Sequence, residues 1–256
     1  MSGLDLIAST LLAPAHGFTT RHGGVSQGEF ASMNLGKSRG DKPGNVLKNY
    51  QILGKHLGFD VKKTVFTWQV HTDIIRTVTQ EDWGQGLVMP QPTPCDGVIT
   101  NVPGTTLVAF SADCTPILLW DEVTGAVGAV HAGWRGTSLG IVAKAVAEMT
   151  AQFGSNPADI RAVIGPCIAS CCFETTDDVP TAMVEALGEV AHTAITSKGE
   201  KWLVDLKKLN HIWLQKAGVT QVEVRPECTA CDLIRFWSHR KVGNVRGSLA
   251  AIIVCP

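Results

Sequence analysis

The stretch between residues 65 and 132 is a succession of short apolar runs, rich in β-branched residues and separated by glycine, proline and polar residues. Runs of this length and composition predict β-strands. The predicted strands are 65–70, 74–79, 97–100, 105–111, 116–120 and 126–132. Because these strands follow one another without a helical pattern between them, strands and helices do not alternate strictly. A doubly wound parallel sheet is therefore disfavoured.

Helical patterns lie on both sides of this strand-rich stretch. Residues 43–57 repeat apolar side chains at spacings of three and four, with Asn45 as a candidate N-cap. Residues 138–153 carry an apolar stripe that includes Leu139, and Gly154 supplies a C-terminal stop. Further elements are predicted as helices near 177–187 and 205–217 and as strands at 160–164, 221–225 and 249–254. We therefore predict an α+β fold, with mixed, layered β-sheets flanked by helices, in a single domain.

The charge balance limits the partners that the chain can have. It contains 22 basic and 23 acidic residues, so it lacks the positive excess that binding to a nucleic-acid backbone or an anionic membrane requires. No apolar run approaches the ~20 residues of a membrane-spanning helix, and the N-terminal residues lack the positive start of a secretory signal. We expect a cytoplasmic protein without nucleic-acid or membrane partners, whose eight cysteines stay reduced.

Three residues with metal-ligating side chains stand at the ends of predicted strands, namely His71, Cys114 and His131. Strand ends that meet at one rim can bring polar side chains together around a ligand. Two imidazoles and one thiolate suit Zn²⁺ and leave a fourth position for water or substrate, as in catalytic sites. Cu²⁺ is a less favoured alternative. Considered alone, these residues also fit an ordinary role, with a buried thiol and hydrogen-bonded or surface histidines.

Two further segments are rich in cysteine. Cys167, Cys171 and Cys172 lie in a turn after the predicted strand 160–164, and their spacing matches no zinc framework. Cys228 and Cys231 form a Cys-x-x-Cys pair without a second such pair or a paired histidine. We interpret both segments as structural thiols.

Candidate anion-binding and acid–base residues lie near these motifs. Arg21 opens a glycine-rich stretch whose backbone N–H groups could bind phosphate, and Arg135 and Arg246 are further candidates for phosphate or substrate. Asp73 and Asp113 stand beside the presumed metal ligands, where each could orient a histidine, act as a catalytic base or cap a turn. The alternative for the arginines is solvated surface charge.

Several motifs in order give the chain a resemblance to a known family. They are Trp-Gln-Val-His-Thr-Asp (68–73), Ala-Asp-Cys-Thr-Pro (112–116), Val-His-Ala-Gly-Trp-Arg-Gly (130–136) and Gly-Pro-Cys-Ile (165–168), with further matches near Arg21, Cys228 and Ser238. They resemble the purine nucleoside phosphorylase family of the laccase-domain type, also described as multicopper polyphenol oxidase and peptidoglycan editing factor. Because the resemblance covers almost the whole chain, we expect residues 1–256 to form one domain of this type.

The resemblance implies a zinc site with ligands at His71, Cys114 and His131. It also implies phosphorolysis of adenosine, inosine and methylthioadenosine, together with adenosine deamination. In this setting Cys114, Asp73 and Asp113 are the candidate catalytic residues. One departure concerns the substrate pocket, because the chain has Asn-Val-Arg at 244–246 where the family tends to have Thr-Gly-Arg.

Other functions use the same residues differently. Cys114 could be the nucleophile of a cysteine hydrolase or amidase that edits a peptidoglycan precursor, with His131 or His71 as its base. A copper-dependent polyphenol oxidase is disfavoured, because several clustered coppers need about ten imidazole ligands and the chain has eight histidines. A non-catalytic zinc module would close the fourth ligand position. The sequence does not separate the zinc enzyme from the cysteine hydrolase.

Overall fold

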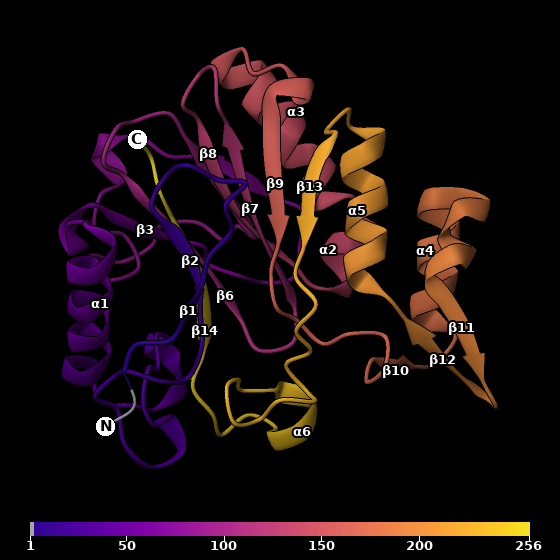
Figure 1. The fold of residues 1–256 in the computed structure, drawn as a ribbon, viewed down its shortest axis with the longest axis horizontal. Helices are drawn as coiled ribbons and strands as arrows, with labels where there is room; N and C mark the ends of the chain where they lie inside the picture. The colour runs from indigo at the N-terminus through magenta and orange to yellow at the C-terminus, as the bar shows by residue number, and fades with distance from the viewer. Residues whose placement is uncertain (1–2) are drawn as a thin grey trace.

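Two β-sheets packed face to face form the centre of the computed structural model, which describes residues 3–256 (Figure 1). The first sheet has the order β1 (Leu6–Ile7), β2 (His16–Thr19), β14 (Leu249–Val254), β6 (Thr106–Ser111) and β3 (Thr64–Phe66). The second has the order β13 (Gln221–Val224), β9 (Ile160–Ile164), β7 (Thr115–Asp121), β8 (Val127–Ala132), β5 (Gly97–Thr100) and β4 (Ile75–Thr77). Parallel and antiparallel pairs occur in both sheets, which confirms the predicted α+β fold with mixed sheets.

Helices cover the outer faces of the two sheets, so that the central strands are buried on both sides. On β6, Leu107 and Ala109 face the second sheet, whereas Val108 packs under α1 (Pro43–Leu57). On β7, Leu118 faces the first sheet, and its neighbours pack under α3 (Ile141–Phe153) and α5 (Leu206–Lys216). Figure 1 shows α1 on one side of the sheets and α5 on the other. Burial of both strand faces explains why these strands are continuous apolar runs in the sequence.

The predicted helix at 138–153 is wrong in its first turn. The chain forms α2 (Trp134–Ser138), breaks at Gly140 with a φ of 72°, and resumes as α3. Only glycine adopts this left-handed conformation at little cost, and the break leaves Leu139 exposed instead of in the core. The stop at Gly154 and the predicted strands at 97–100, 160–164 and 249–254 are confirmed.

The boundaries of other helices and strands also differ from the predictions. Helix α1 begins at Pro43, so Asn45 lies inside the helix, where its amide donates to Asp41 instead of capping. The predicted strand at 65–70 ends at Phe66, and beyond it the side-chain amide of Gln69 bonds both the N–H and the carbonyl of Phe110 in place of a backbone partner. Helix α4 (Asp178–Leu187) and α5 match their predictions within a residue. The small sheet β10 (Glu174–Thr175), β12 (Lys201–Val204) and β11 (Ile195–Lys198), and helix α6 (His239–Val242), were not predicted.

Among residues 3–256, no helix has the length and apolar character that a membrane span requires.

The core between the sheets makes one glycine sensitive to substitution. A Cβ at Gly165 would lie 2.2 Å from a ring carbon of Phe18, which is buried between the sheets. We expect Gly165→Ala to lower the free energy of unfolding by about 1–3 kcal/mol, because the phenyl ring is forced from its packed position. Chemical denaturation measures the change. Gly44→Ala in α1 is the control, since open space surrounds that position and alanine is the better helix former by up to about 1 kcal/mol. Equal stability of the Gly165 variant and wild type would contradict this packing argument.

Candidate metal centre and substrate pocket

The three predicted ligands meet at one end of the second sheet. His71 follows β3, Cys114 immediately precedes β7, and His131 lies on β8 beside it. The Nε2 atom of His71 lies 3.8 Å from Sγ of Cys114, and the ligand atoms of all three residues lie within 4.8 Å of one another. Ligand atoms around a tetrahedral zinc with N and S ligands are about 3.5 Å apart. The arrangement therefore fits a metal with little movement of side chains.

Asp96 organises two of these ligands and was not predicted. Its buried carboxylate accepts hydrogen bonds from the backbone N–H groups of Val70 (3.1 Å), His71 (3.0 Å) and Thr72 (2.8 Å), and from the Thr72 hydroxyl. It also bonds Nδ1 of His131 at 2.8 Å, so Nε2 is the ring nitrogen available as a metal ligand. This network holds His71 at a φ of 63°, a conformation uncommon outside glycine. A carboxylate that orients a ligating histidine is a recurrent feature of metal sites.

The electrostatics of the site favour charged forms of these groups. Burial raises the pKa of Asp96, but hydrogen bonds from His131 and the backbone outweigh burial and bring the pKa to about 2. Burial lowers the pKa of His131, but Cys114 and Asp96 raise it to about 9. Burial raises the pKa of Cys114, but the positive charge of His131 and hydrogen bonds from both histidines lower it to about 6. The thiolate of Cys114 is thus favoured, and this is the form that binds metal or acts as a nucleophile.

Gly133 is required by close packing beside the ligands. A Cβ there would lie 2.9 Å from Cδ2 of His71 and 3.3 Å from Sγ of Cys114. This contact gives a physical reason for the glycine in Val-His-Ala-Gly-Trp, because a side chain there would crowd His71 and Cys114 and force one of them to shift.

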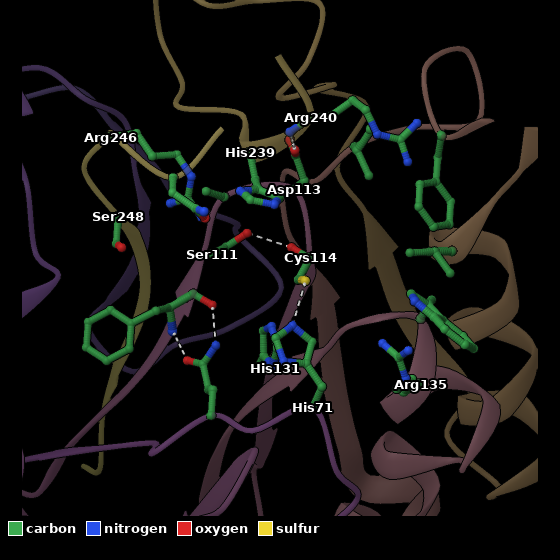
Figure 2. Close-up of a pocket in the computed structure, with 18 of the residues that line it drawn as sticks. His71, Ser111, Asp113, Cys114, His131, Arg135, His239, Arg240, Arg246 and Ser248 are labelled. Atoms are coloured by element: carbon green, nitrogen blue, oxygen red, sulfur yellow. Dashed lines mark hydrogen bonds between the residues drawn. The ribbon is translucent and has the colours of Figure 1, made fainter. Parts of the chain in front are cut away.

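A pocket of about 470 Å³ opens beside the three ligands (Figure 2). Aromatic rings and basic side chains share its walls, together with Gln69, Ser111 and Leu206. The rings are Phe110, Trp134 and Phe173, and the basic residues are Arg39, Arg135, His239, Arg240 and Arg246. In Figure 2, the sulfur of Cys114 points toward the two histidine rings, and Arg246 and Ser248 lie on the opposite side from Arg135. A small molecule with a flat ring and an anionic partner would suit these walls.

Arg246 is the most enclosed of the basic residues. It is only 6% exposed, and its Nη1 donates to the carbonyl of Gly247. Its Nε has no hydrogen-bond partner among residues 3–256. Burial and the nearby Arg39 lower the pKa of Arg246 to about 10, so it keeps its charge at neutral pH. The Nε of Arg39 donates to the Ser248 hydroxyl at 3.4 Å, and neither arginine forms an ion pair within the described part of the chain.

The other two predicted anion-binding arginines differ in position. Arg135 lines the pocket, with its guanidinium 4.3 Å from the centre of the Trp134 ring. Arg21 is not among the pocket-lining residues of the described chain. Its side chain donates to the carbonyls of Ala31 and Leu233, so it connects two loops.

The two predicted acids are also separated by the fold. Asp113 lines the pocket and accepts hydrogen bonds from the hydroxyls of Thr229 (2.7 Å) and Ser238 (2.9 Å) and from the backbone N–H of Arg240 (2.6 Å). Asp73 forms an ion pair with Lys144, and the pocket-lining residues within 3–256 do not include it.

The structure corrects the separate interpretation of the cysteine segments. Their spacing in the sequence concealed that Cys171, Cys172, Cys228 and Cys231 lie together, within 4.8 Å of one another. Cys167 remains a buried thiol in the core, as predicted.

Comparison with known proteins finds relatives that match almost the whole chain. Residues 15–256 match the family described as multi-copper polyphenol oxidoreductase laccase. The chain is 37% identical over 242 residues to the purine nucleoside phosphorylase YlmD of Bacillus subtilis, covering 93% of this chain and 87% of that protein. It is 33% identical to the human purine nucleoside phosphorylase LACC1, covering 94% of this chain and 56% of that longer protein. The crystal structure of YlmD from Geobacillus stearothermophilus superposes with a TM-score of 0.92 at 34% identity, covering 99% of this chain and 96% of that one.

Proposed function

Because the chain belongs to the multi-copper polyphenol oxidoreductase laccase family, in which the relatives compared above are named purine nucleoside phosphorylases, we propose that it is a zinc-dependent purine nucleoside phosphorylase. The proposed substrates are adenosine, inosine and methylthioadenosine, with adenosine deaminase as a second activity. The observation that carries this proposal is that one pocket holds both the His71–Cys114–His131 group and the buried guanidinium of Arg246.

Zinc is the metal that fits the ligand group best. Two imidazoles and one thiolate with a free fourth position are typical of catalytic zinc. Bound there, zinc would act as a Lewis acid toward water or a substrate oxygen. Within residues 3–256 no other metal-suitable group contains histidine, so the clustered coppers of a multicopper oxidase would lack imidazole ligands.

Arg246, Arg39 and Ser248 are the proposed phosphate site. Phosphorolysis needs an anion held beside the sugar, where a phosphate oxygen bonds to C1′ as the bond from C1′ to the purine nitrogen breaks. The free Nε of Arg246 and the unpaired charge of Arg39 are suited to phosphate oxygens. Arg135 lies on the other wall, where it could bind a polar group of the nucleoside.

The aromatic residues and the histidine on the remaining walls suit a purine base and the transfer of a proton to it as it leaves. Phe110, Trp134 and Phe173 offer surfaces on which a purine can stack. His239 lines the pocket and is the proposed proton donor to the leaving base. We assign Asp113 a positioning role, because three donors from the loop that carries His239 and Arg240 already occupy its oxygens.

Purine release from adenosine, measured with and without phosphate before and after chelation, tests the proposal. We expect phosphate-dependent adenine release that chelation abolishes and added zinc restores. Arg246→Gln should lower the phosphate-dependent rate by roughly ten- to a hundred-fold, since a charge-assisted hydrogen bond contributes about 1.5–3 kcal/mol. The control is Arg161→Gln, which removes a guanidinium from a surface ion pair with Glu122. No adenine release in the presence of both zinc and phosphate would overturn the proposal.

The lowered pKa of Cys114 supports one alternative, a cysteine hydrolase or amidase acting on a peptidoglycan precursor. In that case Cys114 is the nucleophile, with His131 or His71 as its base. Chelation and thiol alkylation distinguish the two functions. The hydrolase would keep its activity after chelation and would lose it when the thiols of the metal-free protein are alkylated.

A further inference from the structure

Four cysteines from two distant segments form a compact group outside the pocket, which we name the thiol cluster. Cys171 and Cys172 lie in the loop that follows β9, and Cys228 and Cys231 lie in the loop that follows β13. The Sγ atoms of Cys171 and Cys172 are 3.8 Å apart, and they lie 3.5 Å and 3.4 Å from Sγ of Cys231. The parallel pairing of β9 with β13 places the two loops side by side, so the cluster follows from the topology of the sheet.

The distances distinguish among the chemistries open to four thiols. In a tetrahedral site with metal–sulfur bonds of about 2.3 Å, the sulfur atoms are about 3.8 Å apart. The three sulfur–sulfur distances among Cys171, Cys172 and Cys231 are close to this value. They are far longer than the ~2.05 Å of a disulfide, and four thiolates around an iron–sulfur cluster would be spread by the width of the cluster. A set of four soft ligands with this spacing fits a single ion such as Zn²⁺.

The surroundings of the cluster resemble those of a structural metal site. The backbone N–H of Ala169 donates to Sγ of Cys228 at 3.3 Å, and such bonds stabilise a thiolate ligand and fix its orientation. Cys171 and Cys231 are exposed, which gives an ion a path of entry. The backbone of Thr229 bonds that of Cys167 at 3.0 Å, so the two loops are already in register.

The cluster also lies directly behind the pocket. Arg240, which lines the pocket, donates from Nη1 to the carbonyl oxygens of Cys172 and Glu174. Thr229, between the two cysteines of the second loop, donates to Asp113. Fixing the two loops to each other therefore fixes one wall of the pocket.

We propose that Cys171, Cys172, Cys228 and Cys231 bind a second zinc ion, with a structural role, that clamps the loops after β9 and β13 together. Each ligand binds as a thiolate and releases its proton to solvent, and the closed four-ligand set leaves no open position for catalysis. The proposal does not depend on the proposed function or on a metal at His71, Cys114 and His131.

Cobalt binding to the Cys114→Ala variant tests the proposal without an activity measurement. In this variant the pocket site has no thiolate, so any sulfur-to-cobalt charge-transfer absorption comes from the thiol cluster. We expect about one equivalent of Co²⁺ with the intense absorption of a tetrahedral four-thiolate site, and its displacement by Zn²⁺. The further change Cys171→Ser with Cys231→Ser should abolish the absorption.

A second variant keeps the test decisive if the serine changes prevent folding. Cys231→His in the same Cys114→Ala background replaces one sulfur ligand by nitrogen, so it should still bind Co²⁺ but with weaker, shifted charge-transfer bands. Absence of charge-transfer absorption in the folded Cys114→Ala protein would overturn the proposal. So would a Cys171–Cys231 or Cys172–Cys231 disulfide, detected by mass spectrometry in protein purified under reducing conditions, because it would identify a redox pair.

Discussion

Replacing Cys114 with alanine is expected to remove the metal from the pocket and to lower phosphate-dependent purine release by at least about 10³-fold. The thiolate is one of the three proposed ligands, and a bound metal would contribute several kcal/mol of transition-state stabilisation, each 1.36 kcal/mol being tenfold in rate. Because Cys114 also balances the positive charge of His131, its removal leaves the buried imidazole with Asp96 as its remaining anionic partner. Elemental analysis and the purine-release assay on the same sample measure both effects.

The matched control is Cys255→Ala. Cys255 is a buried thiol at the end of the chain, whose Sγ contacts the carbonyl of Gly125. It should lose some stability from the small cavity but keep its metal and its turnover. If Cys114→Ala retained both wild-type metal content and wild-type turnover, Cys114 would be neither a ligand nor a nucleophile.

Asp96→Asn is expected to weaken metal binding by about 10–100-fold and to lower the stability of the fold. The carboxylate serves donors from Val70, His71, Thr72 and His131. An amide has one oxygen, so its NH₂ group would face groups that are themselves donors. Opposite Nδ1 of His131, that NH₂ would favour the tautomer with the proton on Nε2, which is the nitrogen that faces the metal.

Two measurements separate the two effects. Competition with a chelator gives the zinc affinity, and chemical denaturation gives the stability of the fold. Asp121→Asn is the matched control, because Asp121 is also fully buried and accepts hydrogen bonds from the backbone N–H groups of Val123 and Thr124. It should lose stability without losing metal affinity. Equal zinc affinities for Asp96→Asn and wild type would show that Asp96 supports the loop but not the ligands.

The parts of the fold that sequence patterns predicted are those with buried, regular elements. Strands such as 97–100 and 160–164 are mostly apolar because nearly all of their residues are buried, and α1 has a clear apolar stripe. The sheet formed by β10, β12 and β11 was missed because β10 and β11 are short and largely polar, and because the apolar part of β12 is only three residues long. The break at Gly140 was missed because a single glycine does not interrupt an apolar period.

The site shows a similar division. His71, Cys114 and His131 were candidates from their residue types alone, and the resemblance of the motifs around them to a known family selected them. Asp96 could not be selected from the sequence, because an acidic residue before a strand resembles any turn residue. The one signal for it was its position before Gly97, directly ahead of a buried strand. Arg39 lies in a polar loop with no motif. The thiol cluster depended on the pairing of β9 with β13, which no local spacing encodes.

The pocket draws its proposed metal ligands and its proposed phosphate-binding residues from different parts of the chain. His71, Cys114 and His131 belong to the middle of the sequence, whereas Arg246 and Ser248 lie in the segment that leads into β14. On the proposed assignment, substitutions near the C-terminus would therefore alter phosphate binding while the three proposed metal ligands stay unchanged. Asn244 also lines the pocket, so the Asn-Val-Arg sequence at 244–246 can reshape this wall without disturbing the strands that position Cys114 and His131.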